Sequence, residues 1–393
     1  MELVNEIVEA RNFWEAWMSV RHNKGASGID NMSVDVLDVY MPLHMDEIKQ
    51  SICRKQYKPS PVRRVFIPKP NGKQRPLGIP TVVDRVVQQA TAQVLNRIYE
   101  PLFSEHSYGF RPNRSCHQAI NQALDYLNAG YEWVVDFDIE KYFDTVNHDK
   151  LISILREQVN DSATLHLIRS FLKSGVMEGG FVSATTEGVP QGGCISPILS
   201  NIYLDKLDKE LESRELRFVR YADDFDIFVK SERSADRVMA SVSRWLESKL
   251  RLKVSATKTK VVRPTKSVFL GFTFWKSTRG WECRPTDAAK EKLETKVKQV
   301  LVRKRATAQP MSYIFTKLNQ VIRGWVNYYH IGSMATYLRD VFGPWLRHKV
   351  RVVIVKQWKK CSTIHKNLLK IKSIIKSRIT DDAIYQASMT RLG

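Results

Sequence analysis

The sequence Tyr221-Ala222-Asp223-Asp224 stands between two strand-like runs, Leu216-Arg217-Phe218-Val219-Arg220 before it and Phe225-Asp226-Ile227-Phe228-Val229 after it. The period-two pattern on both sides predicts a β-hairpin with two carboxylates at its tip. Adjacent like charges on a tight turn repel each other, and they are tolerated where water or a divalent cation screens them.

A second acidic strand is predicted at Trp133-Val134-Val135-Asp136-Phe137-Asp138-Ile139. Its period of two places Asp136 and Asp138 on the same face. A double Asp taken alone is typical of a solvated turn. Together with Asp138 it favours an oxygen-rich Mg²⁺ site, because paired Mg²⁺ ions about 3.5–4 Å apart assist phosphoryl transfer.

The charge of the chain is concentrated near its C-terminal end. The 393 residues carry a formal net charge of +21, and residues 276–393 hold 25 Lys and Arg against 7 Asp and Glu, a net of +18. Aromatic side chains such as Trp325, Tyr328 and Tyr329 lie among these cations. This mixture favours a nucleic-acid partner, although a solvated helix face over buried aromatics gives the same pattern at any single residue. No long apolar run, signal peptide or lipidation motif is present, so no membrane partner is expected.

The pattern along the chain predicts an α+β fold. Helical segments are expected over the first fifty residues, broken at 23–28, and again at 81–99, 140–174, 198–211 and 234–250. The Asn71-Gly72 pair predicts a hairpin between 62–68 and 74–80, and a short strand pair is expected to end at 268–272. Beyond Trp281 only helices are expected. The five cysteines are odd in number and widely spaced, which indicates reduced thiols and the cytoplasm.

Several further blocks have a recognisable order and spacing. They are Gly25-Ala26-Ser27-Gly28-Ile29-Asp30, Ile67-Pro68-Lys69-Pro70, Ser107-Tyr108-Gly109-Phe110-Arg111-Pro112, Asp138-Ile139-Glu140-Lys141-Tyr142-Phe143-Asp144, Gly188-Val189-Pro190-Gln191-Gly192-Gly193, Lys258-Thr259-Lys260 and Phe269-Leu270-Gly271-Phe272. With the Tyr221–Asp224 segment, these blocks resemble the reverse transcriptases, or maturases, encoded by group II introns, most closely the bacterial group IIC class. The resemblance covers nearly the whole chain and implies a right-hand fold of fingers, palm and thumb.

The resemblance also implies roles for individual residues. Asp138 and Asp223 match metal ligands, Asp224 the third acid, and the carbonyl of Ile139 a further ligand, for two Mg²⁺ ions. Deoxynucleotide contacts are implied for Lys69, Arg75, Ile139, Phe143, Gln191 and Lys258. Within this set Lys69 and Arg75 match a triphosphate clamp, and the Phe143 ring matches a gate against the 2′-hydroxyl. Taken alone, the cations of this set are also typical of a solvated surface, Phe143 of a core and Gln191 of a plain turn.

Template or primer contacts are implied for Tyr108, Phe110 and Arg111, for which helix packing is the alternative, and for Arg323 and Tyr329 in a maturase domain X. The family often carries a C-terminal Cys/His endonuclease, and no such cluster stands in this sequence, so DNA cleavage by this chain is not expected. The implied division is 1–85 for the N-terminal extension and fingers, 86–275 for the palm with part of the fingers, 276–365 for the thumb, and 366–393 for a short basic remnant of a DNA-binding region.

The sequence therefore predicts an RNA-directed DNA polymerase of the group II intron type in the bacterial cytoplasm. Its expected partners are an RNA template, a DNA or RNA primer, deoxynucleotides and intron RNA, which it would bind to assist splicing and retrohoming. Two alternatives stay open at this point. One is an RNA-binding splicing cofactor without polymerase activity, and the other is a retron, CRISPR-associated or defence reverse transcriptase.

Overall fold

The computed structural model describes residues 2–68, 72, 74–359 and 363. The chain divides into two compact units, which are described separately below. The first unit comprises Met1–Ala119 and Trp133–Val261, and the second comprises Ile120–Glu132 and Val262–Gly393. The two units are defined by how densely their residues contact one another. The boundaries of the fingers, palm and thumb stay predictions.

The first unit begins with helices that build a small core of their own. The helices and turns of its N-terminal part are α1 (Leu3–Val8), α2 (Ala10–Asn23), η1 (Val34–Val36), α3 (Leu37–Cys53), α4 (Val82–Tyr99) and η2 (Glu100–Leu102). The predicted helix at 81–99 is confirmed as α4, whose N-cap Thr81 accepts a hydrogen bond from the Asp84 amide. Buried apolar side chains of α1 to α4 pack together with Phe171 of α8 (Ser162–Leu172).

A four-stranded sheet combines two hairpins, one that follows α3 and one that follows α8 in the sequence. Its strands run β2 (Gln74–Ile79), β1 (Val62–Pro68), β4 (Val176–Glu178) and β5 (Phe181–Ser183). The predicted hairpin is confirmed, because β1 and β2 pair antiparallel from Arg63–Ile79 to Pro68–Gln74. The pair β4 and β5 was not expected from the sequence.

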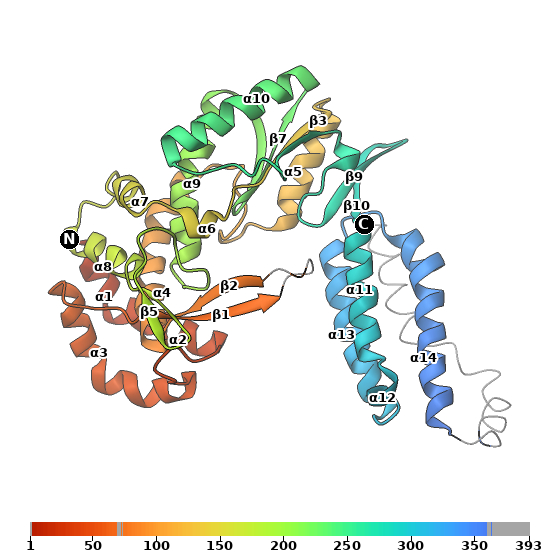
Figure 1. Ribbon diagram of the computed structural model, residues 1–393, viewed down its shortest axis with the longest axis horizontal. Helices are drawn as coiled ribbons and strands as arrows, with labels where there is room; N and C mark the ends of the chain where they lie inside the picture. The colour runs from red at the N-terminus through yellow and green to blue at the C-terminus, as the bar shows by residue number, and fades with distance from the viewer. Residues whose placement is uncertain (1, 69–71, 73, 360–362, 364–393) are drawn as a thin grey trace. The chain divides into compact units, whose positions relative to one another are not determined.

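The second sheet of this unit carries the acidic strands. Its order is β6 (Arg217–Tyr221), β7 (Asp224–Val229), β3 (Trp133–Phe137) and β8 (Lys260–Val262). In Figure 1, α10 (Glu232–Trp245) runs across β7 and β3. The remaining helices of the unit are α6 (Tyr142–Thr145), α7 (His148–Leu155), α9 (Ser196–Ser213) and the π-helical turn η3 (Leu246–Leu250).

The main core lies around this second sheet. Phe137 of β3 stacks on Phe225 of β7 with ring centroids 4.7 Å apart, and both rings are buried. Apolar side chains of α7, α9 and α10 join them in one continuous cluster. Burying an apolar side chain of this size stabilises a fold by about 1.5–3 kcal/mol, so the ends of β3 and β7 rest on a rigid base.

The second unit is a hairpin followed by helices. It contains the latter part of α5 (Cys116–Asn128), η4 (Pro264–Lys266), β9 (Phe272–Ser277), β10 (Gly280–Pro285), α11 (Asp287–Val300), α12 (Arg303–Ala306), α13 (Met311–Tyr329), the π-helical turn η5 (Tyr337–Phe342) and α14 (Gly343–Gln357). Figure 1 shows α11 and α13 side by side. Leu293 of α11, Ile314 and Leu318 of α13 and Leu346 of α14 belong to the core of this unit.

Two local expectations are wrong. A strand begins at Phe272 rather than ending there, because Phe269 and Phe272 close a tight turn in which Leu270 has φ +51° and Gly271 has φ +80°. The chain is also not purely helical beyond Trp281, since β10 continues to Pro285. Within the residues described, no helix is both long and apolar enough to cross a membrane.

Candidate active site

Three carboxylates share one end of the β6–β7–β3 sheet. The last paired residues of the antiparallel strands β3 and β7 are Phe137 and Phe225. Asp138 and Asp224 are the next residues on the two strands, and they stand opposite each other just beyond that pair. Tyr221 pairs with Asp224 across the hairpin, which leaves Ala222 and Asp223 as its two-residue turn. Asp138 therefore neighbours Asp223 and Asp224, which stand 85 and 86 residues later in the sequence.

Burial, with repulsion between neighbouring carboxylates, raises the pKa of Asp223 and Asp224. The pKa of Asp224 rises to about 6, first because protein removes water around the carboxylate and then through repulsion from Asp223, Asp138 and Asp136. The Asp224 residue nevertheless keeps an exposed surface, so it is enclosed on some sides and open to water on another. Loss of water also raises the pKa of Asp223, while the charges of Arg75 and Arg220 lower it.

Lysines from the 253–260 segment counter part of this negative charge. The Lys258 ammonium donates to both oxygens of Asp138, at 2.9 Å and 2.8 Å. Lys260 lies 3.4 Å from Asp136. The backbone of Asp138 is fixed as well, because its amide donates to the Thr259 hydroxyl and its carbonyl accepts from the Ser255 amide. Strand β3 is thus held in place up to the acidic residue itself.

The fit of a divalent cation depends on these oxygens. In the part of the chain that is described, no three His, Cys, Asp or Glu side chains form a ready-made metal cluster. The Lys258 ammonium engages both oxygens of Asp138 in this state. The donor set still suits Mg²⁺, since it consists of hard carboxylate oxygens whose mutual repulsion a cation would relieve. Ile139 follows Asp138 directly in the chain, on a backbone segment bridged to Val254.

A cavity of about 400 Å³ lies between the first sheet and α6. Phe143 and Gln191 both line it, together with Arg64, Pro76 and Gly78. The loop that carries Gln191 is fastened at both ends, because the Val189 amide donates to the Phe143 carbonyl at 2.6 Å and the Gly78 amide donates to the Gln191 carbonyl at 2.7 Å. Two of the residues predicted to contact a nucleotide therefore face one space.

The remaining nucleotide candidates lie in different surroundings. Arg75 is exposed on β2, and its charge acts on Asp223. Lys69 lies outside the described residues. Lys258 is exposed and paired with Asp138, as described above.

The candidates for template contact divide into one exposed and two buried side chains. Phe110 is 47% exposed, with a left-handed φ of +59°. Tyr108 is buried. The Arg111 guanidinium donates to the Glu100 carboxylate and to the carbonyls of Ser104 and Ser107, so its hydrogen bonds hold the surrounding loop together.

The two candidates of the second unit both lie on α13. Arg323 is exposed, whereas Tyr329 packs between Trp325 and Phe272 with ring centroids 4.7 Å and 4.9 Å away. A groove of about 570 Å³ runs along α11 and α13, with Lys292, Lys296, Gln320 and Tyr329 among its lining residues. A wall that combines ammonium groups, an amide and an aromatic ring is suited to a polynucleotide strand. Lys292, Lys296 and Gln320 were not singled out from the sequence.

Comparison with known proteins decides the family. Residues 67–274 match the family described as reverse transcriptase (RNA-dependent DNA polymerase), which is more than half of the chain. The chain belongs to the reverse transcriptases. Residues 290–372 match the maturase-specific domain of group II introns. The two matches confirm the resemblance to reverse transcriptases of group II introns.

Relatives of this reverse transcriptase include intron-encoded proteins. Protein YkfC of Escherichia coli is 34% identical over 290 residues, which cover 63% of this chain and 76% of YkfC. The group II intron-encoded protein LtrA of Lactococcus lactis is 40% identical over 209 residues, which cover 53% of this chain and 35% of LtrA. The telomerase of Candida albicans shares the fold, with a TM-score of 0.50 at 12% identity over 91% of this chain and 69% of that chain.

The raised pKa of Asp224 leads to a prediction for the metal-free enzyme. The pKa of Asp224 in the folded protein is about 6, against an ordinary value of 3.8, so ionisation of this carboxyl lowers the stability of the fold. The loss of stability is small near pH 4, grows as the pH rises to about 6, and is complete above it. Asp224→Asn should raise the melting temperature at pH 7.5 by on the order of 1–2 °C, after allowance for solvent screening, and should change it much less at about pH 4.

Calorimetry with EDTA at the two pH values measures this difference. Added Mg²⁺ should then stabilise the parent protein more than the Asn variant at pH 7.5. An Asn variant that is no more stable than the parent at pH 7.5 would show that the carboxylates do not strain one another.

Proposed function

We propose that this reverse transcriptase copies RNA into DNA at the carboxylate end of the β6–β7–β3 sheet, with Mg²⁺ as its metal. In this reaction the 3′-hydroxyl of a primer attacks the α-phosphate of a deoxynucleotide and pyrophosphate leaves. The observation that carries the proposal is the convergence of Asp138, Asp223 and Asp224. The match of residues 67–274 to the reverse transcriptase family supports the proposal.

The residues of this chain would divide the work as follows. Asp138 and Asp223, with the Ile139 carbonyl and with Asp224 close by, would hold two Mg²⁺ ions. When bound, the ions stabilise the negative charge that develops on the transferred phosphoryl group and on the attacking and leaving oxygens. Lys69 and Arg75 would bind the triphosphate, the Lys as a point charge and the Arg as a two-pronged donor.

Lys258 would act in two states. Without a cation its ammonium neutralises Asp138 through two hydrogen bonds. A cation at Asp138 would repel the ammonium, which is then free to meet a phosphate oxygen, because the exposed Lys side chain has room to move. Gln191 and Phe143 would bound the sugar and base from the cavity that they line.

Nucleic acid would contact the rest of the surface. We propose that Phe110 on one unit, and Arg323 and Tyr329 on the other, contact the template and primer. The buried Tyr108 and Arg111 would serve the template path by holding the loop that carries Phe110. The maturase-specific domain supports intron RNA as a further partner, and with it a role in splicing. It also favours an intron enzyme over a retron or defence enzyme. Bacterial relatives support the bacterial cytoplasm as the place of action.

Primer extension tests the polymerase proposal directly. The full chain is incubated with a DNA primer annealed to a structured RNA, deoxynucleotides and Mg²⁺, and the products are resolved by length. Full-length DNA is the expected result, and EDTA should abolish it. Absence of extension with RNA templates, alongside intact RNA binding, would leave the splicing role as the function.

Substitution of Phe143 should relax the choice of sugar. The ring is half-buried at the edge of the main core and lines the cavity beside Gln191. If it excludes the 2′-hydroxyl by contact, Phe143→Ala should lower the preference for deoxynucleotides over ribonucleotides by about 10–100-fold. Competition between the two nucleotide types in single-turnover extension measures this ratio. Phe143→Leu, which retains bulk, should change the ratio less, and an equal ratio in all three proteins would place the discrimination elsewhere.

A further inference from the structure

Arg220 is an arginine whose whole side chain is buried next to the acidic turn. It stands on β6 with 0% exposure, one residue before Tyr221. Its backbone joins β6 to the 106–108 segment, since its amide donates to the His106 carbonyl and its carbonyl accepts from the Tyr108 amide. A buried guanidinium requires partners, because an uncompensated charge in a protein interior is costly.

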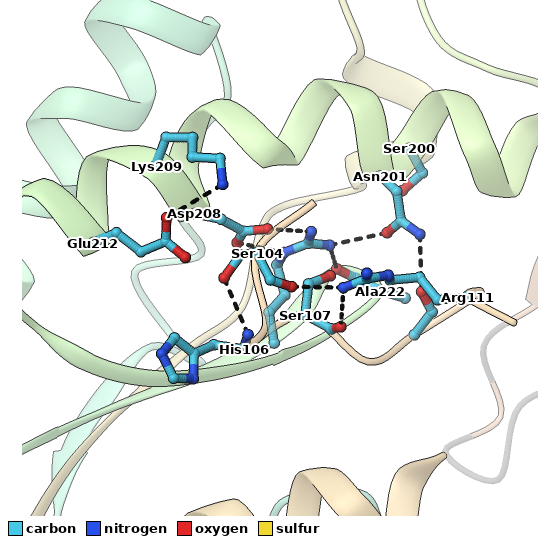
Figure 2. Close-up of polar contacts among 12 residues, drawn as sticks. Ser104, His106, Ser107, Arg111, Ser200, Asn201, Asp208, Lys209, Glu212 and Ala222 are labelled. Carbon is cyan, nitrogen blue, oxygen red and sulfur yellow. Dashed lines mark hydrogen bonds and ion pairs between the residues drawn. The ribbon is translucent and has the colours of Figure 1, made fainter. Parts of the chain in front are cut away.

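The partners come from one face of α9. The Arg220 Nε donates to Oδ1 of Asp208 at 2.7 Å and its Nη2 donates to Oδ2 at 2.5 Å, a two-pronged ion pair with no exposed surface on either side chain. Its Nη1 donates to Oδ1 of Asn201, two helical turns earlier, at 3.1 Å. Figure 2 shows Asn201 and Asp208 projecting from α9 toward the segment that carries Ala222.

The same Nη1 also donates to the Ala222 carbonyl, at 2.9 Å. This carbonyl belongs to the peptide group whose nitrogen is that of Asp223, and a peptide group is planar. The hydrogen bond therefore fixes the plane from which the Asp223 side chain departs. It does so at a residue that needs support, since Ala222 has a left-handed φ of +60°, which an alanine adopts at a cost of about 1–2 kcal/mol.

A second restraint on the turn comes from its contact with Gly109. The side-chain Nδ2 of Asn201 donates to the Gly109 carbonyl at 2.9 Å. Gly109 lies so close to Ala222 that a Cβ placed on it would stand 2.2 Å from the Ala222 nitrogen. Asn201 thus links the guanidinium that holds the turn to the backbone against which the turn rests.

We propose that Arg220, oriented by Asp208 and Asn201, is a positioning residue of the reaction, which holds the Ala222–Asp223 peptide so that Asp223 meets a divalent cation together with Asp138. The inference rests on the proposed function for what the cation does. It also has a consequence independent of turnover, because a displaced Asp223 should bind a cation less tightly in the absence of any nucleic acid. Residues that orient metal ligands typically contribute about 10–100-fold to affinity or activity.

Two variants loosen the turn in different ways. In Arg220→Lys the ammonium can stay paired with Asp208, so the buried charge keeps its counter-ion. A single ammonium cannot also reach Asn201 and the Ala222 carbonyl. In Asn201→Ala the ion pair remains and the link to Gly109 is lost. Should Arg220→Lys fail to fold, Asn201→Ala decides the question by the same measurements.

A matched control separates positioning from stability. Asp161 caps α8 in the same unit and accepts hydrogen bonds from Val4, Ala163 and Thr164, so Asp161→Ala destabilises the fold without contact with the turn. Affinity for Mn²⁺ alone is measured by electron paramagnetic resonance for the full chain, for the two variants, for Asp161→Ala and for Asp223→Ala. Steady-state extension then gives kcat and the KM for the deoxynucleotide.

The proposal expects Arg220→Lys and Asn201→Ala to weaken Mn²⁺ binding by about 10-fold and to lower kcat by about 10–100-fold, with KM within about 2-fold of the parent. Asp161→Ala should retain the parent's Mn²⁺ affinity. Variants whose affinity and kcat match those of Asp161→Ala would overturn the proposal, as would a parent protein whose Mn²⁺ affinity does not depend on Asp223. A parent that binds Mn²⁺ through Asp223 without extending primers would refute the polymerase function instead, and the Mn²⁺ affinities would still decide the role of Arg220.

Discussion

Asp223→Ala should abolish primer extension on RNA, with a loss of at least about 10³-fold, while RNA binding stays close to that of the parent. A cation that stabilises developing charge contributes several kcal/mol to the transition state, and each 1.36 kcal/mol is tenfold in rate. Asp223 stands at the tip of the hairpin beside Asp138 and Asp224, and removal of one of three carboxylates leaves too few oxygens for two ions.

The fold should tolerate this change. Loss of water raises the pKa of Asp223, so the ionised side chain is a strained group whose removal relieves repulsion. RNA phosphates are anions and gain nothing from a carboxylate, so filter binding of a structured RNA should be unaltered. Asp236→Ala is the matched control, because Asp236 is an exposed acid on α10 away from the turn. Extension by Asp223→Ala at the rate of Asp236→Ala would end the assignment of the site.

The same variant separates the two roles of the protein. Splicing of a bound intron needs contacts to RNA and not the polymerase carboxylates, so Asp223→Ala should still assist splicing while it fails to extend primers. The maturase-specific match over residues 290–372 motivates this expectation. Loss of both activities in a folded, RNA-binding variant would mean that the two functions share the acidic site.

Sequence reasoning succeeded where the structure is local. The hairpin of β1 and β2 follows from strand-like runs around Asn71-Gly72, and the β6–β7 hairpin follows from the alternation around Tyr221. Helix α4 follows from its apolar period. The placement of Asp138, Asp223 and Asp224 at strand ends also follows locally, since the neighbours of each acid specify its strand.

The misses involve short or non-local features. Strands β4 and β5 are three residues each, and β4 is stabilised by parallel pairing with β1, more than a hundred residues earlier. Gly179-Gly180 between them was the available signal for a two-residue hairpin turn. Residues 120–132 join the second compact unit, and no periodicity within them could indicate this.

Arg220 illustrates the limit for functional residues. In the sequence it is a cation in an alternating strand, a position that usually faces water. Its burial depends on Asp208 and Asn201, which α9 brings to the sheet from 12 and 19 residues away. The sequence signal for this network is weak. It consists of a charged residue just before an acidic turn, and of Asn201 and Asp208 seven residues apart, on one face of the preceding helix.

Gly109→Ala is expected to have the second largest effect on primer extension, because the added methyl group would collide with the acidic turn. Gly109 has no left-handed φ, so alanine is compatible with its own backbone angles. The added Cβ would lie 2.2 Å from the Ala222 nitrogen, 2.9 Å from the Tyr221 carbonyl carbon and 3.0 Å from the Ala222 Cα. All three are backbone atoms, which no rotamer change can move aside.

The two segments must therefore separate, and two hydrogen bonds are strained as they do so, from the Tyr108 amide to the Arg220 carbonyl and from Asn201 to the Gly109 carbonyl. Overpacking of this kind costs about 1–3 kcal/mol, and a displacement of about 1 Å at a reacting centre lowers the rate by about 10²-fold. We expect Gly109→Ala to lower the melting temperature by several degrees and to reduce extension at 25 °C by about 10²-fold or more, as calorimetry and single-turnover kinetics would measure.

Gly324→Ala supplies the contrast. Gly324 lies within α13, where an added Cβ meets no atom within 4 Å, so alanine should stabilise the helix by about 1 kcal/mol. The two glycines thus receive the same methyl group with opposite expected signs. If Gly109→Ala melts as the parent does and extends primers at the parent's rate, the acidic turn is not held against the 107–110 segment, and the restraint on Asp223 must come from Arg220 alone.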